Sequence, residues 1–439
     1  MSTTLFKVDG IDLSTIFAPY ISGTKASATG YSVINNDLSN IFAPYVSGTK
    51  ASVTGYSVNN NDLSNIFLKI RSWTTVGTSA LVGTGAACNV IYIDSTTGYI
   101  YIGGVFTSVG GVTAKNIARW DGTSWSNLAT GLNNAVNDIV VNSSGIIYAC
   151  GIFTDTGTAT TGCLSIAYYT PGSPFSSGVW AQLGVGFQSG TVLNTLDIIS
   201  GKIYIGGAYT TNGNGVVGSF QNICYWGTSG FYVAIPAAST ASKNGFDAAC
   251  LAVKNNTVNG YIYFGGAFTG FYQRSLTTTT CNRVCSYDGT YFNIMSPGPG
   301  VNGQVNAITF DPSGNVYFGG SFTTAGSVSV KNVVKWTSSS LNTTTHVETG
   351  TWSALGVGLN GAVNSLSFAN NTLYAGGSFT TLGDTTTTVN YIASYTGSSW
   401  SVISTSLNNS VKTITLDSSG VIYAGGSFTS PYTGLAKYS

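Results

Sequence analysis

The stretch VNAITFDPSGNVYFGGSFT, residues 305–323, contains the clearest structural pattern in the chain. VNAITF alternates apolar and polar residues, DPSG can form a tight turn, and NVYFGGSFT follows as a second β-type run. An Asp opens such a turn by hydrogen bonding to its own backbone, and a Gly adopts the left-handed conformation that other residues resist. The stretch therefore predicts a β-hairpin.

The second half of this hairpin recurs along the chain as a GGxFT motif. It is found as GGVFT at 103–107, CGIFT at 150–154, GGAYT at 206–210, GGAFT at 265–269, and GGSFT at 319–323, 376–380 and 425–429. Successive aromatic residues of the motif, from Phe106 to Phe428, are on average about 54 residues apart, a spacing typical of β-propeller blades. Seven copies predict seven blades.

Each repeat is long enough for four strands. After the hairpin comes a third apolar segment, such as NIARWDG at 116–122, and then a fourth that begins with an aromatic residue, such as SWSNLATGL at 124–132. Four antiparallel strands make one propeller blade. The abundance of β-branched and aromatic residues, with 57 glycines, agrees with an all-β fold.

The two ends of the repeat region complement each other. The seventh repeat stops at Ser439 after its third strand, whereas RSWTTVGTS at 71–79 matches the fourth strand of other repeats. Trp73 occupies the place that three tryptophans hold elsewhere: Trp125, Trp352 and Trp400. We expect residues 71–79 to complete the last blade and close the ring, leaving no free sheet edge at the seam.

A second family of repeats fills residues 1–69. Units of 25 residues span 12–36 and 37–61, and a truncated copy spans 62–67. In each copy an Asp can cap a short helical turn with three apolar residues on one face, and GYSV is expected to be extended. The nine apolar residues are Leu13, Ile16, Phe17, Leu38, Ile41, Phe42, Leu63, Ile66 and Phe67. One unit cannot bury this face alone, so we interpret the segment as an attachment or assembly arm that packs on its own propeller or on another chain.

Composition restricts the partners. The net charge is +1 and no Lys/Arg cluster is present, which argues against nucleic acid. No apolar run reaches the roughly 20 residues that span a bilayer, and the first residues resemble no secretory signal. The seven cysteines form no CxxC pair, so neither disulfides nor a zinc site are expected.

Within residues 70–439, the motif IYxGGxFT is followed by an aromatic-Asp-Gly turn and then by Trp-Ser-x-Leu. This pattern resembles kelch-type propeller repeats and, more closely, Rax2-like repeats of surface proteins. The DLSxIFAPY units resemble repeats of predicted virion proteins of aquatic viruses. These resemblances imply a closed propeller carried behind an assembly arm. They imply little about activity, because propellers serve many unrelated tasks.

Residues suited to catalysis are scarce. The one histidine, His346, and the one glutamate, Glu348, both fall in an insertion of the fifth repeat (337–351) that we expect to be a solvated loop. Copper oxidases on kelch-like rings need two histidines, and sialidase-like propellers need an arginine triad. We therefore predict no catalytic residue, no cofactor and no metal site.

The candidate recognition surface consists of the loops between second and third strands, which differ in every repeat. Its most conspicuous residues are Phe271, Tyr272 and Arg274, whose rings and guanidinium group suit a protein or sugar partner. Local packing is the alternative for this group.

Three interpretations of function stay open. The favoured one is a non-enzymatic structural or surface-display protein on a virion or in an extracellular filament, which contacts protein partners or cell-surface glycans. A lectin-like glycan-binding propeller is the alternative. A polysaccharide hydrolase or lyase is the third, and the scarcity of His and Glu opposes it.

Overall fold

The computed structural model describes residues 72–77, 81–156, 162–210, 221–228, 230–233, 243–275 and 278–439, together with six dipeptides between residues 7 and 62. The chain divides into two compact units, Met1–Arg71 and Ser72–Ser439. Each unit is described separately below.

The described dipeptides of the first unit form three antiparallel hairpins. The paired strands are β1 (Lys7–Val8) with β2 (Ile11–Asp12), β3 (Ser32–Val33) with β4 (Asn36–Asp37), and β5 (Ser57–Val58) with β6 (Asn61–Asp62). The second and third hairpins lie where one 25-residue unit ends and the next begins, and the extended conformation predicted for GYSV is confirmed at β3 and β5. The predicted helical turns and their nine apolar residues, from Leu13 to Phe67, lie outside the described residues.

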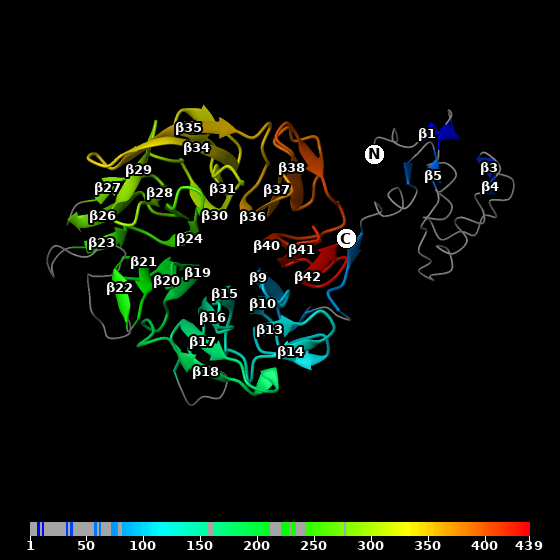
Figure 1. Ribbon diagram of the computed structural model, residues 1–439, viewed down its shortest axis with the longest axis horizontal. Coiled ribbons are helices and arrows are strands. Elements are labelled where there is room, and N and C mark those ends of the chain that lie inside the picture. Colours follow the sequence, from blue (N-terminus) through cyan, green and yellow to red (C-terminus); the bar gives the residue numbers. More distant parts are fainter. Residues whose placement is uncertain are drawn as a thin grey trace. The chain divides into compact units, whose positions relative to one another are not determined.

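The second unit is a β-propeller, in which sheets surround a common centre (Figure 1). The strands of the first sheet are β9 (Ala87–Ile93), β10 (Ile100–Val105), β13 (Ile117–Trp120) and β14 (Trp125–Asn127). The second sheet contains β15 (Val136–Val141), β16 (Ile147–Gly151), β17 (Ile166–Thr170) and β18 (Val179–Gln182), with the short 3-10 helix η1 (Phe175–Ser177) between the last two. The third contains β19 (Val192–Ile199), β20 (Lys202–Ala208), β21 (Ile223–Trp226) and β22 (Phe231–Val233).

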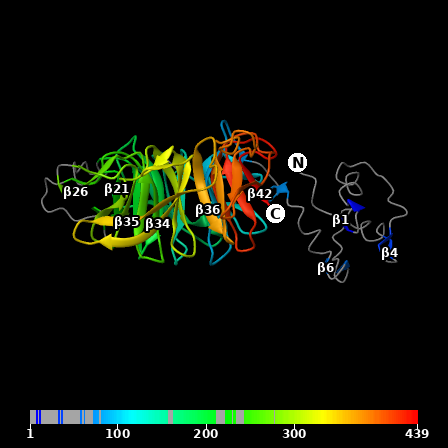
Figure 2. The ribbon, with the colours of Figure 1, turned by 90° about the horizontal axis from the view of Figure 1, so that it is seen from above.

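The remaining sheets repeat this order. The fourth contains β24 (Cys250–Asn255), β25 (Ile262–Gly266), β28 (Val284–Tyr287) and β29 (Phe292–Ser296), and the fifth β30 (Gln304–Phe310), β31 (Val316–Ser321), β34 (Val333–Asn342) and β35 (Val347–Ala354). The sixth contains β36 (Val363–Ala369), β37 (Thr372–Gly377), β38 (Ile392–Tyr395) and β39 (Trp400–Val402). The last contains β40 (Val411–Leu416), β41 (Ile422–Gly426), β42 (Leu435–Tyr438) and β7 (Trp73–Thr74). The first strand of each set lies nearest the centre, and Figure 2 shows the ring from its side.

Shorter strands extend the loops. They are β8 (Leu81–Val82) with β11 (Ser108–Val109) and β12 (Val112–Thr113), β23 (Lys243–Phe246) with β26 (Gly270–Ser275) and β27 (Thr278–Thr280), and β32 (Thr324–Ala325) with β33 (Val328–Ser329). The stretch from Gly270 to Thr280, expected as a loop, is therefore largely a β-hairpin. Its threonines favour an extended backbone, and β23 provides a pairing partner.

The seam joins the two ends of the propeller sequence. Strand β7 pairs antiparallel with β42, with Trp73 opposite Tyr438. The backbones of Ser72 and Ser439 exchange hydrogen bonds of 3.1 and 3.3 Å, and the rings of Trp73 and Tyr438 lie 5.3 Å apart. The strand pairing predicted for Trp73 is thus present.

The paired glycines of the GGxFT motif allow neighbouring strands to approach closely. A Cβ on Gly319 would lie 2.5 Å from Val363 Cγ1 of the next blade, and one on Gly320 would collide with the carbonyl oxygen of Gln304. The second contact coincides with a bulge between β30 and β31. Both positions of the fifth blade therefore exclude a side chain, whereas Cys150 occupies the first position in the second blade.

One part of the propeller departs from the predicted separate blades. Strands β29 and β35 pair in parallel, with Met295 opposite Glu348, so that the fourth and fifth blades form one eight-stranded sheet. The 337–351 insertion is therefore not a solvated loop, and that expectation is wrong. Its Thr- and Ser-rich sequence extends β34 and β35 until they reach the exposed edge of β29.

Candidate functional site

A cavity of about 560 Å³ occupies the centre of the propeller. The innermost strand of every blade lines it, from β9 to β40. The lining combines polar side chains such as Asn89 and Asn306 with apolar ones such as Ile308. The channel is the principal candidate site.

Asparagines near the start of four inner strands form what we call the asparagine ring: Asn89, Asn137, Asn306 and Asn364. The side-chain amide of each donates a hydrogen bond of 2.8–3.0 Å to a backbone carbonyl oxygen of the next blade, at Val136, Leu193, Val363 and Val411 respectively. Lys412, in the equivalent position of the last blade, donates to Asn89 Oδ1 at 2.8 Å. The ring therefore ties neighbouring blades together along the channel wall.

Three further charged residues, Asp138, Asp197 and Lys254, line the channel. Asp138 Oδ2 accepts a hydrogen bond of 2.8 Å from the Leu196 backbone, and Asp197 Oδ2 accepts one of 3.2 Å from Asn255. Burial raises the pKa of Asp138 to about 6. The negative charge of Asp197 raises the pKa of Lys254, against the opposing effect of burial. These residues give the channel one cationic and two acidic groups.

A second hollow, of about 520 Å³, opens beside the channel and shares Tyr92 and Asp197 with it. Its other lining residues include Tyr148 and Trp226, from the second and third blades, and the amide of Asn142. Aromatic faces beside carboxylate and amide groups suit a ligand with both apolar and hydroxyl-bearing surfaces. We call this site the inter-blade hollow.

The predicted recognition residues do not form one exposed group. Phe271 is only 2% exposed and packs against Phe292, with ring centroids 5.3 Å apart, so this residue follows the alternative of local packing. The alternation of β26 directs its ring toward the core. Tyr272 is half-buried in the same strand, and the side chain of Arg274 lies outside the described residues.

Glu348 is also placed differently from the prediction. It is fully buried, and its Oε1 accepts hydrogen bonds from the Tyr263 hydroxyl at 2.7 Å and from Trp336 Nε1 at 3.0 Å. His346 is half-buried and stacks on Tyr291, with ring centroids 4.0 Å apart. The sequence contained no sign of this burial, because it depends on the pairing of β35 with another repeat.

Sequence reasoning missed the channel residues. The available signal was the recurrence of Asn after an apolar residue at the start of the first strand, as in VNDIVV, VNAITF and VNSLSF.

Among the described residues, no group of three or more His, Cys, Asp or Glu side chains could hold a metal ion. Within the same residues, no helix is long and apolar enough to cross a membrane.

Comparison with known proteins supports the fold. A family model of the Rax2 C-terminal beta propeller domain matches residues 300–439. No curated protein matches the chain. The extracellular domain of BT4673 from B. thetaiotaomicron is 14% identical with a TM-score of 0.50, and the match covers 84% of this chain and 39% of that one.

A further solved structure is similar over nearly all of its own length. The WD40 beta propeller domain of Doa1 is 10% identical with a TM-score of 0.47, and the match covers 84% of this chain and 97% of that one. The chain spans about 39% of the length of the two BT4673 structures that it matches. Together with the strand order, the family match defines the protein class as an all-β protein with a β-propeller domain.

Proposed function

We propose that this chain is a non-enzymatic structural or surface-display protein of a virus particle or extracellular filament. In this proposal the arm anchors the protein and the propeller contacts a protein or glycan partner. One observation supports this proposal most. Polar side chains of the channel make hydrogen bonds to the backbone of neighbouring blades, so they already have structural partners.

Acid-base catalysis requires a titratable side chain, such as a histidine or a carboxyl group, that can reach a substrate proton. Both oxygens of Asp138 accept backbone hydrogen bonds, from Ile139 and Leu196, and Asp197 is held in the same way by Ile198 and Asn255. These bonds fix the carboxylates against the channel wall. The arrangement favours a rigid scaffold that binds over a site that performs chemistry.

The test compares the full chain with a variant lacking residues 1–69. We expect the full chain to form large assemblies or to attach to its particle, and the truncated propeller to stay monomeric, as measured by sedimentation velocity and electron microscopy. Equal assembly by both proteins would contradict the role of the arm.

Glycan binding is the second candidate, and the inter-blade hollow favours it. Tyr148 lines the hollow, whereas its cross-strand neighbour Tyr168, with ring centroids 6.1 Å apart, does not. Tyr148→Ala should therefore abolish signals on a glycan array that Tyr168→Ala retains. If Tyr272→Ala alone removes binding, the variable loop face is the site instead. An array without signal for the wild-type protein would exclude this candidate.

A further inference from the structure

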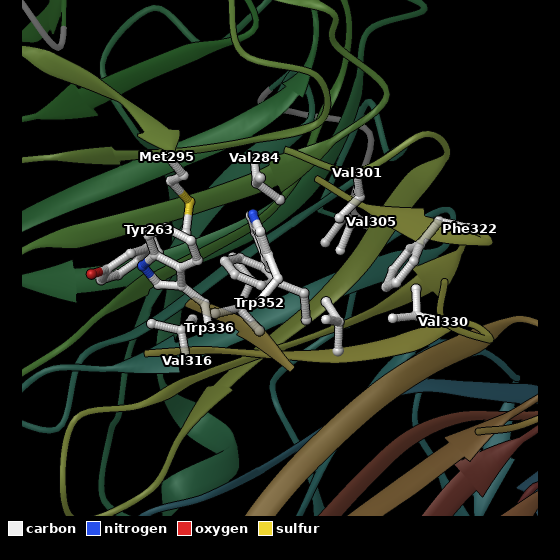
Figure 3. Packing of buried hydrophobic residues seen from close by; sticks show 14 of the residues in the cluster. Tyr263, Val284, Met295, Val301, Val305, Val316, Phe322, Val330, Trp336 and Trp352 are labelled. Atoms are coloured by element: carbon white, nitrogen blue, oxygen red, sulfur yellow. The ribbon is translucent and has the colours of Figure 1, made fainter. Parts of the chain in front are cut away.

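The contact between the fourth and fifth blades encloses several polar groups without partners. Tyr263 lies opposite Ser286, Ser286 lies opposite Asn293, and Met295 lies opposite Glu348. Since Asn293 and Met295 are two residues apart in β29, all five side chains project from the same face of the eight-stranded sheet. Figure 3 shows Tyr263, Met295 and Trp336 in the apolar cluster on this face.

Ser286, Asn293 and Glu348 have no exposed surface. The Ser286 hydroxyl, both amide atoms of Asn293 and Glu348 Oε2 have no hydrogen-bond partner. Buried polar atoms without partners are rare, because each loses its hydrogen bonds to water without a replacement. Several of them on adjacent strands indicate that a polar ligand belongs between them.

The charge of Glu348 narrows the choice of ligand. Its partners, Tyr263 and Trp336, are both neutral, and Tyr263 in turn accepts a hydrogen bond of 3.0 Å from Asn259. Water molecules could satisfy the hydrogen bonds of the site but would leave a carboxylate uncompensated in an apolar core, which is strongly unfavourable. A cation would bind the free oxygens and balance the charge.

We propose that Glu348 Oε2, Asn293 Oδ1 and Ser286 Oγ hold one monovalent alkali cation, Na⁺ or K⁺, between the fourth and fifth blades. One carboxylate balances one positive charge, and the other two ligands are neutral oxygens. A divalent ion would leave an excess positive charge in the core. The bound cation ties β28, β29 and β35 together and stabilises the contact made by the extended β34–β35 hairpin.

The test measures thermal unfolding of the full chain in choline chloride and then in NaCl or KCl at equal ionic strength. The alkali cation should raise the melting temperature by roughly 2 °C or more, since a ligand that binds only the folded state stabilises it. Glu348→Gln, which keeps an acceptor for Tyr263 and Trp336, should lose this shift, and Ser286→Ala should reduce it. Asp384→Asn, a control that removes an exposed carboxylate, should retain it.

A second measurement does not depend on any variant. Crystals soaked in a thallium(I) salt should show an anomalous peak between Glu348, Asn293 and Ser286. Equal melting temperatures of the wild-type protein in choline and alkali chlorides, or a soaked crystal without this peak, would overturn the proposal and leave water or a protonated Glu348 in the site. Stabilisation by CaCl₂ but not by NaCl or KCl would overturn the assignment of a monovalent ion.

Discussion

Single asparagine side chains join loops that are distant in sequence. Asn332 adopts a φ of +64°, its Oδ1 accepts a hydrogen bond from the Phe322 backbone, and its Nδ2 donates to the Leu359 carbonyl at 2.8 Å. Asn116 makes the equivalent bonds in the first blade. Asparagine tolerates the left-handed conformation and has both a donor and an acceptor. Such residues therefore stabilise the ring instead of serving a ligand.

In four blades of the described chain, a tryptophan near the start of the fourth strand donates a hydrogen bond to a backbone carbonyl oxygen of the preceding blade. Trp400 Nε1 donates to the Leu355 carbonyl at 2.7 Å, whereas Trp73 Nε1 has no partner among the described residues. Trp400→Phe should leave the carbonyl unpaired and lower the free energy of unfolding by about 1–2 kcal/mol more than Trp73→Phe does. Urea unfolding of both variants measures the difference, and equal losses would show that the hydrogen bond contributes little.

The buried carboxyl of Asp138 should make stability depend on pH. Burial raises its folded-state pKa to about 6, above the usual 3.8. Between pH 4 and 6 the unfolded chain ionises at this residue while the folded protein stays protonated, so stability falls as the pH rises through this window and then levels off. Because the side chain opens on the channel, we expect a loss of about 1–2 kcal/mol.

Chemical unfolding at pH 4 and pH 7 measures this contribution. Asp138→Asn, which cannot ionise, should show a smaller decrease between the two pH values, and Asp417→Asn, at a half-buried position in a hairpin turn, should show the same decrease as the wild-type protein. A decrease in Asp138→Asn as large as in the wild type would assign the effect to other groups.

At the level of elements, the insertions of two repeats pack against the preceding blade, residues 170–179 in the second and 337–351 in the fifth. In the second blade, the segment before β18 places Phe175 against Arg119, whose guanidinium carbon lies 3.6 Å from the ring centroid. In the fifth blade, His346 stacks on Tyr291, and its carbonyl accepts a hydrogen bond of 2.9 Å from the Ile294 backbone. Both insertions therefore protect the outer edge of a neighbouring sheet.

Strand β7 should contribute more to stability than its two residues suggest. A chain lacking residues 1–69 keeps this strand, whereas one lacking residues 1–80 loses it and exposes the edge of β42. We expect the longer deletion to lower the melting temperature by at least about 5 °C relative to the shorter one, as measured by calorimetry. Similar melting temperatures of the two truncations would argue against closure of the ring by β7.

At the level of the whole molecule, the charge composition predicts that the protein does not bind nucleic acid. The 16 basic and 15 acidic residues give a net charge of +1. Without a concentrated positive surface, counterion release cannot drive binding to a phosphate backbone. A mobility-shift assay with DNA or RNA should show no complex at physiological salt. Salt-dependent retardation of either nucleic acid would contradict this prediction.

Much of the fold was predictable from residues close together in the chain. Strand alternation, Asp-Ser-Gly turns and paired glycines are local patterns that recur along the repeats. The pairing of the segments at Trp73 and Ser439, which are distant in the chain, followed from comparing the repeats with one another. They predicted the hairpins, the blade order and the pairing of β7 with β42. The burial of Trp125 and Trp400 also followed from their recurrence once per blade.

The candidate sites depended on contacts between repeats, which no local pattern describes. The burial of Glu348 requires the parallel pairing of β35 with β29, and Phe271 is buried because β26 pairs with β23. The asparagine ring becomes a channel wall only when seven inner strands converge. A side chain's exposure depends on which neighbour covers it, and in a propeller that neighbour lies a full repeat away along the chain.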